Sequence, residues 1–443
     1  MRAIPRGTAT ICLIAFSLIQ EPLTHIDTTA GILAAQWRAT LTIPGVERLV
    51  VVVLLMYFLA STLLRLRPTA YAHLWPKDAY FFLTQAVLLT VLNCLLDAGA
   101  RSGSLEAIVL LFGALAGRSA NLAVDWQTSS RESEATINRL VISIALLLTI
   151  VSLLSASNDQ NIRYRGNARS TGPWQNPNTY GLLTGVSTIL NTGLIISSFR
   201  FPMSKVRFME WARRSTYATA AAVALLGAMS SYSRGAWVGI GCGGAILAFQ
   251  AFLRFVRNAT RKEIISHLAI SFACLLLSGF ALAFFELRYT QNAILRRLFS
   301  ILDLNDFSWR NRVATWNACL QMMGDRPWFG CGWELPKDIL GTYYLANGHA
   351  NPSALQTNDF LMLGAALGVP AFVMFVLFFL LSLCNEDLDG DGYQRYSEKA
   401  SWLRATCRSA VVVFLVGFWF DGGLFQIATA IPFWILIELG RSS

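Results

Sequence analysis

Arginine residues stand close to the ends of several long apolar stretches of this chain. Arg169, Arg234, Arg310 and Arg312 occur in polar segments that precede or separate such stretches. The guanidinium group stays charged and binds phosphate through two parallel hydrogen bonds. These residues would therefore suit an anionic ligand such as a lipid phosphate or diphosphate. Charge alone equally allows ordinary ion pairs with acidic residues of the same segments, or contacts with lipid headgroups.

The elements that must position these arginines are membrane-spanning helices. Of the 443 residues, 54% are hydrophobic and 14% are charged, whereas soluble domains carry about a quarter charged residues. Apolar runs of roughly 18 residues predict helices that cross a membrane. About twelve runs occur, the shortest of which need flanking residues to cross: 8–19, 49–64, 80–96, 105–123, 137–155, 180–198, 218–229, 237–252, 268–285, 360–383, 410–420 and 424–438. We therefore expect an all-α polytopic membrane protein whose first run is a retained helix.

The basic residues predict the orientation of these helices. If the N-terminus is cytoplasmic, well over half of the 36 Lys and Arg residues fall in cytoplasmic segments, as the positive-inside rule requires. Both termini then face the cytoplasm. Because this topology accounts for the net charge of +10, a surface that binds nucleic acid is an unnecessary assumption.

This topology divides the chain into four segments. They are N-terminal helices in 1–155, central helices with arginine-bearing outer loops in 156–287, a large outer loop in 288–356 between the ninth and tenth spans, and C-terminal helices in 357–443. The large loop is rich in Trp and Tyr, so its composition is not that of a disordered linker. The arginines of the outer segments oppose the positive-inside bias, and an anion on that face would explain them.

Four local sequences surround these arginines. They are RSTGPWQNPN at 169–178, SRGAW at 233–237, RVATW at 312–316 followed by RPWFGCG at 326–332, and TNDFL at 357–361. In this order, and with a long loop between the ninth and tenth spans, the chain resembles the O-antigen ligase/polymerase superfamily of bacterial membrane glycosyltransferases. The resemblance runs from about residue 160 to residue 385.

The resemblance implies a metal-independent transferase of the bacterial inner membrane, with no cofactor. Such enzymes take a glycan from an undecaprenyl-diphosphate carrier on the periplasmic side and pass it to a glycolipid (lipid A–core) or a growing polysaccharide. Without a metal, arginines must stabilise the charge of the diphosphate leaving group. Arg234 and Arg312 match the family's arginines and Arg169 also fits its pattern, while Arg310 competes with Arg312 for the role in the long loop.

Three further residues are candidates for contact with the glycan. Asn178 and Asn358 lie in the matching motifs, and Trp174 is one of several tryptophans that could stack on a sugar ring. Each has an ordinary structural explanation. An asparagine at the start of a helix caps its free N–H groups, and tryptophans concentrate at membrane interfaces.

The general base is the point at which the sequence departs from the family. Ligases carry a histidine just before the asparagine of the tenth span's opening motif, and here that position is Thr357. His349 lies eight residues upstream and is one candidate for the base. Asp359 is the other, because a carboxylate can accept a hydroxyl proton.

Other interpretations compete with a ligase or polymerase. A flippase or transporter of lipid-linked sugars would need charge within its spans, and a non-catalytic component of a polysaccharide export system would explain the missing histidine. Residues 387–398 fit a calcium-loop template in part, with a solvated acidic turn as the simpler account. A disulfide between Cys319 and Cys331 is also possible in an oxidising compartment.

Overall fold

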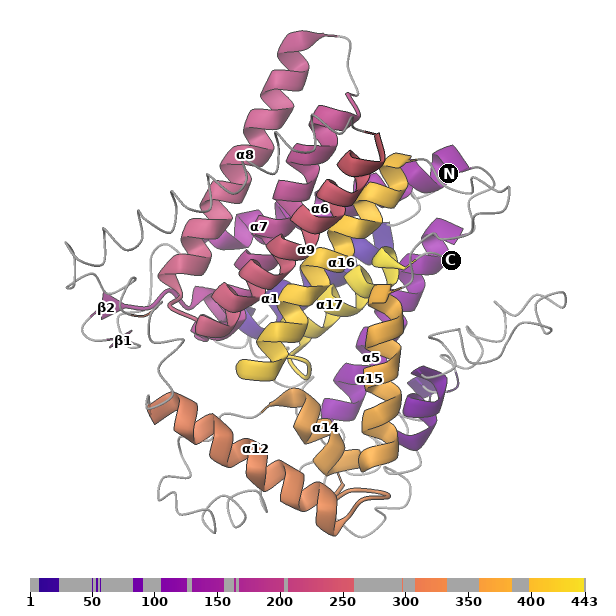
Figure 1. The fold of residues 1–443 in the computed structure, drawn as a ribbon, viewed down its shortest axis with the longest axis vertical. Helices are drawn as coiled ribbons and strands as arrows, with labels where there is room; N and C mark the ends of the chain where they lie inside the picture. The colour runs from indigo at the N-terminus through magenta and orange to yellow at the C-terminus, as the bar shows by residue number, and fades with distance from the viewer. Residues whose placement is uncertain are drawn as a thin grey trace, which may run out of the picture.

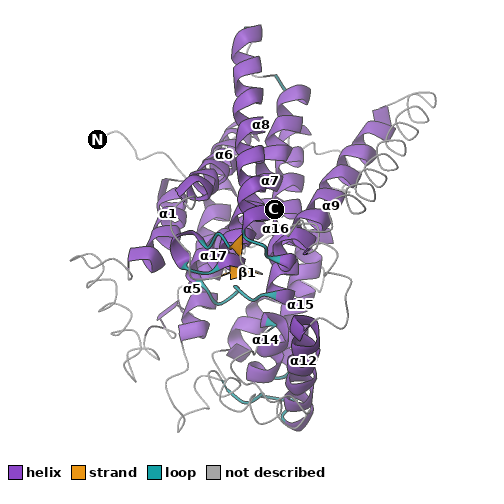
Figure 2. Cartoon of the chain, turned by 90° about the vertical axis from the view of Figure 1, so that its left-hand side faces the viewer, coloured by secondary structure: helices purple, strands orange, loops and turns teal. Residues whose placement is uncertain are grey.

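The structure is a computed structural model built almost entirely of α-helices (Figure 2). It describes residues 8–23, 83–90, 105–125, 130–154, 163–164, 167–202, 206–258, 307–332, 358–384 and 398–441, together with residues 50, 53, 54, 56 and 297. Within these ranges the only strands are β1 (Arg163–Tyr164) and β2 (Asn167–Ala168), which pair as a short antiparallel hairpin.

A bundle of long apolar helices forms the body of the molecule (Figure 1). Five helices of the described part are long and apolar enough to cross a membrane: α5 (Leu105–Asp125), α6 (Ser130–Leu154), α7 (Pro177–Arg200), α9 (Arg234–Asn258) and α16 (Glu398–Phe420). A helix rises about 1.5 Å per residue, so such lengths match a hydrocarbon core of about 30 Å. Three shorter apolar helices accompany them: α1 (Thr8–Leu23), α15 (Val369–Cys384) and α17 (Ile427–Gly440).

These helices make the chain a helical polytopic membrane protein, as the composition predicts. The expected number of about twelve spans stays a prediction, because the runs at 49–64, 80–96 and 268–285 lie wholly or partly outside the described residues. The run at 218–229 forms the second half of α8 (Arg207–Ser230), whose first half is charged. The short run at 410–420 continues back to Glu398 as α16.

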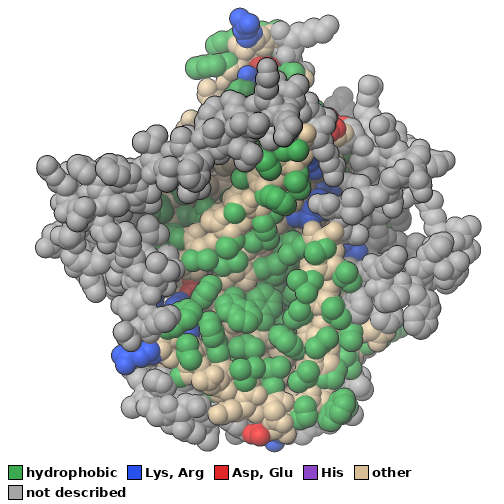
Figure 3. All heavy atoms as spheres, in the orientation of Figure 1, with side chains coloured by type: hydrophobic (Ala, Val, Ile, Leu, Met, Phe, Trp, Pro, Cys, Tyr) green, Lys and Arg blue, Asp and Glu red, His purple; other side chains and the backbone are tan. Residues whose placement is uncertain are grey.

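The exterior of the bundle matches this assignment. Figure 3 shows a broad face of hydrophobic side chains with Lys and Arg at its edges. Large apolar side chains on this part of the molecule are exposed, among them Phe249 of α9 and Leu380 of α15. In water such a continuous apolar face would be unfavourable, whereas lipid tails solvate it.

The predicted span at 360–383 is wrong as a single helix. The structure breaks it into α14 (Asp359–Leu367) and α15, with Gly368 between them at a φ of +87°. A Cβ at Gly368 would lie 2.5 Å from the carbonyl oxygen of Trp328. The segment after α12 (Phe307–Asp325) therefore presses against the break, and Val369 N donates to Pro327 O at 2.7 Å.

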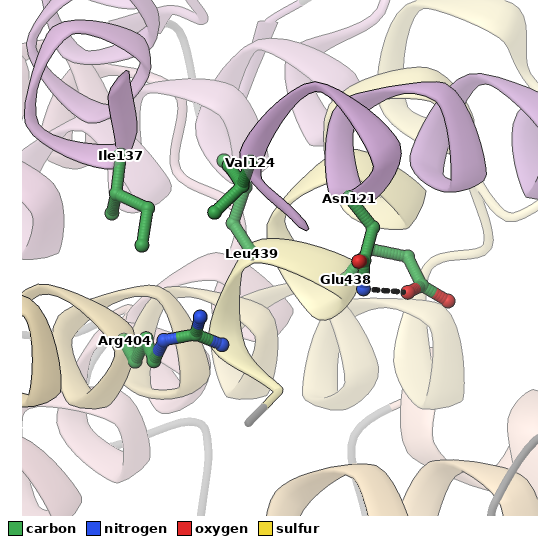
Figure 4. A pocket seen from close by; sticks show the side chains of 6 residues that line it. All are labelled: Asn121, Val124, Ile137, Arg404, Glu438 and Leu439. Atoms are coloured by element: carbon green, nitrogen blue, oxygen red, sulfur yellow. Dashed lines mark hydrogen bonds between the residues drawn. The ribbon is translucent and has the colours of Figure 1, made fainter. Parts of the chain in front are cut away.

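The helix α12 crosses one end of the bundle beside α14 (Figure 1). At the opposite end, side chains of α5, α6, α16 and α17 line a small hollow (Figure 4). There Asn121 Nδ2 donates to Glu438 Oε2 at 3.0 Å, and Arg404 lines the same hollow. The two polar ends of the molecule are thus separated by the apolar body.

Glycines bring α9 and α16 into backbone contact. A Cβ on Gly239 would lie 2.8 Å from Val413 O, and one on Gly243 would lie 2.6 Å from Ser409 O. Small residues spaced four apart allow such close packing in membranes, where dispersion contacts replace the hydrophobic effect between helices. Because α9 begins at Arg234, this contact also fixes the position of that residue relative to α16.

We expect Gly243→Val to lower the thermal stability of the protein by about 1–3 kcal/mol, because the opposing group is backbone and cannot rotate away. Gly241→Ala is the matched control on the same helix, since no atom lies within 4 Å of its Cβ position. Heat-induced unfolding in detergent, followed by tryptophan fluorescence, measures both. Equal melting temperatures for the two variants would contradict the close contact.

Candidate functional site

A buried ion pair joins α12 to the end of α16. Arg312 Nη2 donates to Asp421 Oδ1 at 2.7 Å, and Arg312 Nε donates to Phe420 O at 2.9 Å. Their side chains are 7% and 2% exposed. Two donors fixed on two acceptors hold the plane of the guanidinium group, which a single flexible contact would not do.

The turn between α8 and α9 reaches the same carboxylate. Ser233 Oγ donates to Asp421 Oδ2 at 2.9 Å, so both oxygens of Asp421 accept a hydrogen bond. A Cβ at Gly235 would lie 2.4 Å from Asp421 Oδ2, so the carboxylate can pack here only because residue 235 is glycine. Arg234 stands between these two residues and is buried. Both sequence neighbours of Arg234 therefore lie against the aspartate that pairs with Arg312, 78 positions further along the chain.

Arg169 approaches from the segment before α7. Its Nε donates to Ser231 O at 2.8 Å and its Nη2 donates to Asn178 Oδ1 at 3.2 Å. The pKa of the Arg169 guanidinium is lowered to about 10, first by burial and then by the positive charges of Arg297 and Arg234, while Asp421 opposes the shift. Arg169 therefore stays protonated near neutral pH, although it lies among other cations.

A fourth arginine, Arg297, completes the group, although it stands in none of the four sequence motifs. Arg297 Nε donates to Tyr232 O at 3.3 Å, one residue before the Ser233 that contacts Asp421. We call Arg169, Arg234, Arg297, Arg312 and Asp421 the arginine cluster. No local sequence motif marked Asp421 or Arg297 as part of a site.

The two long-loop arginines take different positions. Arg310 and Arg312 are two residues apart on α12, a spacing that places side chains on different faces of a helix. Arg312 points into the arginine cluster, whereas Arg310 is exposed. The structure therefore favours Arg312 of the two and leaves Arg310 outside the cluster.

The candidate glycan contacts have mainly local partners. Asn178 accepts from Arg169, and the capping of α7 is done by its neighbour Asn176. Asn358 caps α14, with Oδ1 accepting from the N–H groups of residues 360 and 361. Trp174 is buried in a short 3₁₀ helix, η2 (Gly172–Trp174), rather than exposed to a ligand.

Of the two candidate bases, one lies in the described part of the chain. His349 lies outside the described residues. Asp359 is buried, and its Oδ2 accepts the backbone N–H of Leu424 at 2.6 Å. It therefore anchors the turn at Gly422 and Gly423, where φ is +75° and +133°, to the start of α14. That turn directly follows Asp421, so Asp359 lies next to the arginine cluster.

Cys319 and Cys331 are both free thiols. Cys319 lies on α12 with its sulfur 3.8 Å from that of Met362, and burial raises its pKa to about 12. Cys331 is also free and buried. The disulfide considered between them is therefore not formed in this structure.

The fold and the site together define a helical membrane protein with a buried group of arginines at one end of its bundle. A family model described as O-antigen ligase matches residues 219–376. The resemblance found in the sequence is thereby confirmed over this segment. It includes Arg234, Arg297, Arg312 and Asp359, whereas Arg169 and Asp421 lie outside it. No curated protein matches the chain.

We expect Asp421→Asn to destabilise the protein by about 3–5 kcal/mol, because it removes the carboxylate from a buried ion pair and leaves Arg312 among other cations. Adding Arg312→Gln should restore part of that loss. The control is Glu398→Gln, which removes the partner of Arg200 at an exposed site and should cost at most about 1 kcal/mol. Thermal unfolding in detergent measures all three; a double variant no more stable than Asp421→Asn would contradict the pairing.

Proposed function

We propose that this protein transfers a glycan from an undecaprenyl-diphosphate carrier to a hydroxyl acceptor at the periplasmic face of a bacterial inner membrane. The O-antigen ligase domain supports the class of reaction. The observation that carries the proposal is that arginines from four segments of the chain lie in one cluster with Asp421, which pairs with Arg312 and accepts from Ser233. The acceptor is lipid A–core for a ligase, or a growing polysaccharide for a polymerase.

The reaction defines what the arginine cluster has to do. The acceptor oxygen attacks the anomeric carbon, the bond from that carbon to the diphosphate oxygen breaks, and the diphosphate leaves with the electron pair. Charge therefore develops on the leaving oxygen, where fixed cations stabilise it more effectively than water could. In a buried site of low effective dielectric constant, each guanidinium–phosphate contact is also stronger than at an exposed surface.

Asp421 would serve this reaction without touching the substrate. It fixes the orientation of Arg312 and accepts from Ser233 beside Arg234, so it sets the geometry of the residues on both sides. Its negative charge also lowers the cost of holding cations together before the substrate arrives. A metal-independent mechanism follows if these arginines neutralise the diphosphate themselves.

A transporter of lipid-linked sugars has one observation in its favour. Arg404 and Arg408 are buried within α16, so charge does occur inside a candidate span. Arg404 lines the small hollow beside α17, however, at the end of α16 opposite to Asp421. A transfer assay with purified protein in detergent separates the two functions, since a transporter forms no new glycosidic bond.

We expect Arg234→Lys to lower the rate of glycan transfer by roughly 10- to 100-fold, because lysine keeps the charge but loses the paired donors of the guanidinium group. The measurement is product formation from a lipid-linked donor by purified protein in detergent. Arg310→Lys makes the same substitution on an exposed residue and should leave the rate unchanged. Wild-type activity in Arg234→Lys would remove this residue from leaving-group stabilisation.

The same assay decides between the two candidate bases. A general base typically contributes about 10²- to 10⁴-fold, so replacing the true base should lower the rate by that order. Asp359→Asn keeps an oxygen that can accept from Leu424 N and removes the basic carboxylate. His349→Ala removes the imidazole. We expect one of the two variants to lose activity, and full activity in His349→Ala would exclude that residue from the mechanism.

A further inference from the structure

Aromatic side chains form a wall next to the arginine cluster. The Trp309 and Trp316 rings of α12 meet edge to face at 5.7 Å, and Trp316 meets Trp419 of α16 at 5.6 Å. Phe420 lies within 6.4 Å of both α12 tryptophans, and the guanidinium carbon of Arg312 is 5.9 Å from its ring. The wall and the arginine cluster therefore share an edge at Phe420 and Arg312.

These rings are not fully covered by the protein. Trp419 is 38% exposed, and Trp309, Trp316 and Phe420 are each partly exposed. Aromatic rings at a membrane interface usually place their polar N–H in the wet headgroup region. The indole nitrogen of Trp316 is instead buried. Anchoring in the interface does not account for that arrangement.

Two buried donors at this wall have no hydrogen-bond partner within the described structure. One is Trp316 Nε1 and the other is Asn358 Nδ2. Asn358 lies two residues before Phe360, whose ring contacts Trp419 at 6.1 Å. A buried donor without a partner costs about 1–3 kcal/mol, so such groups in a folded protein call for an explanation. A ligand that brings oxygen acceptors would satisfy both.

A sugar ring has the required chemistry. One face of a pyranose presents C–H groups that pack on aromatic rings, and its hydroxyl oxygens accept hydrogen bonds. We propose that Trp309, Trp316, Trp419 and Asn358 form a subsite for the sugar attached to the diphosphate of the donor. The assignment to the donor follows from the shared edge with Arg312. The proposal rests on the proposed function, because it takes the arginine cluster to be the diphosphate site.

Binding of two lipids to the full-length protein in detergent tests the subsite. The probes are undecaprenyl diphosphate and the same lipid carrying one N-acetylglucosamine, and the quantity of interest is the ratio of their dissociation constants. We expect the sugar-bearing lipid to bind more tightly to the wild type. Trp316→Phe keeps a ring but lacks the N–H, and Asn358→Ser keeps an oxygen that can cap α14 but lacks the amide donor.

Each of these two variants should lower the preference for the sugar-bearing lipid, measured as the ratio of the two dissociation constants, by about 3- to 10-fold, which corresponds to one hydrogen bond. Binding of the bare lipid should stay unchanged. Trp328→Phe is the control, since Trp328 is 71% exposed in the segment after α12. If both variants kept the wild-type preference for the sugar-bearing lipid, or if the wild type showed no such preference, the subsite would be overturned and the diphosphate site would still stand. Failure of both lipids to bind the wild type would overturn the proposed function and this subsite together.

Discussion

The buried contact between Arg312 and Asp421 holds one end of the molecule together. It joins α12, which crosses the end of the bundle, to α16, which runs through it. Burying two ions costs more than their mutual attraction returns unless other groups complete the hydrogen bonding. Here Phe420 O and Ser233 Oγ do so. The pair therefore fixes how α9, α12 and α16 pack at this end. The other arginines lie around this fixed contact.

The class of fold and part of the site were predictable from the sequence because both have local signals. Apolar runs of span length are visible in any window of the chain. Arg234 and Arg312 stand in short motifs; Arg312 pairs with Asp421, and Ser233 beside Arg234 donates to the same carboxylate. The choice between Arg310 and Arg312, in contrast, depends on the rotation of α12, which pairing with Asp421 determines.

The parts that escaped prediction depend on contacts between distant segments. Arg297 has no motif, and its link to the site is a bond to the backbone of Tyr232, 65 positions away. The break at Gly368 interrupts an apolar run that looks continuous, because the carbonyl of Trp328 occupies the space that a side chain would need. Periodicity and composition carry no information about either contact, because each joins segments that are far apart in the sequence.

Backbone hydrogen bonds join the segment after α12 to the end of α14. Cys331 N donates to Ala365 O, Gly332 N to Ala366 O and Val369 N to Pro327 O, at 2.7–3.0 Å. Backbone donors and acceptors are present whatever the side chain, so most substitutions in this segment leave the bonds in place. The exceptions are Gly330, Gly332 and Gly368, whose φ angles are positive. The position of α12, and with it that of Arg312, therefore tolerates changes of side chain along residues 327–332 that a contact between side chains would not.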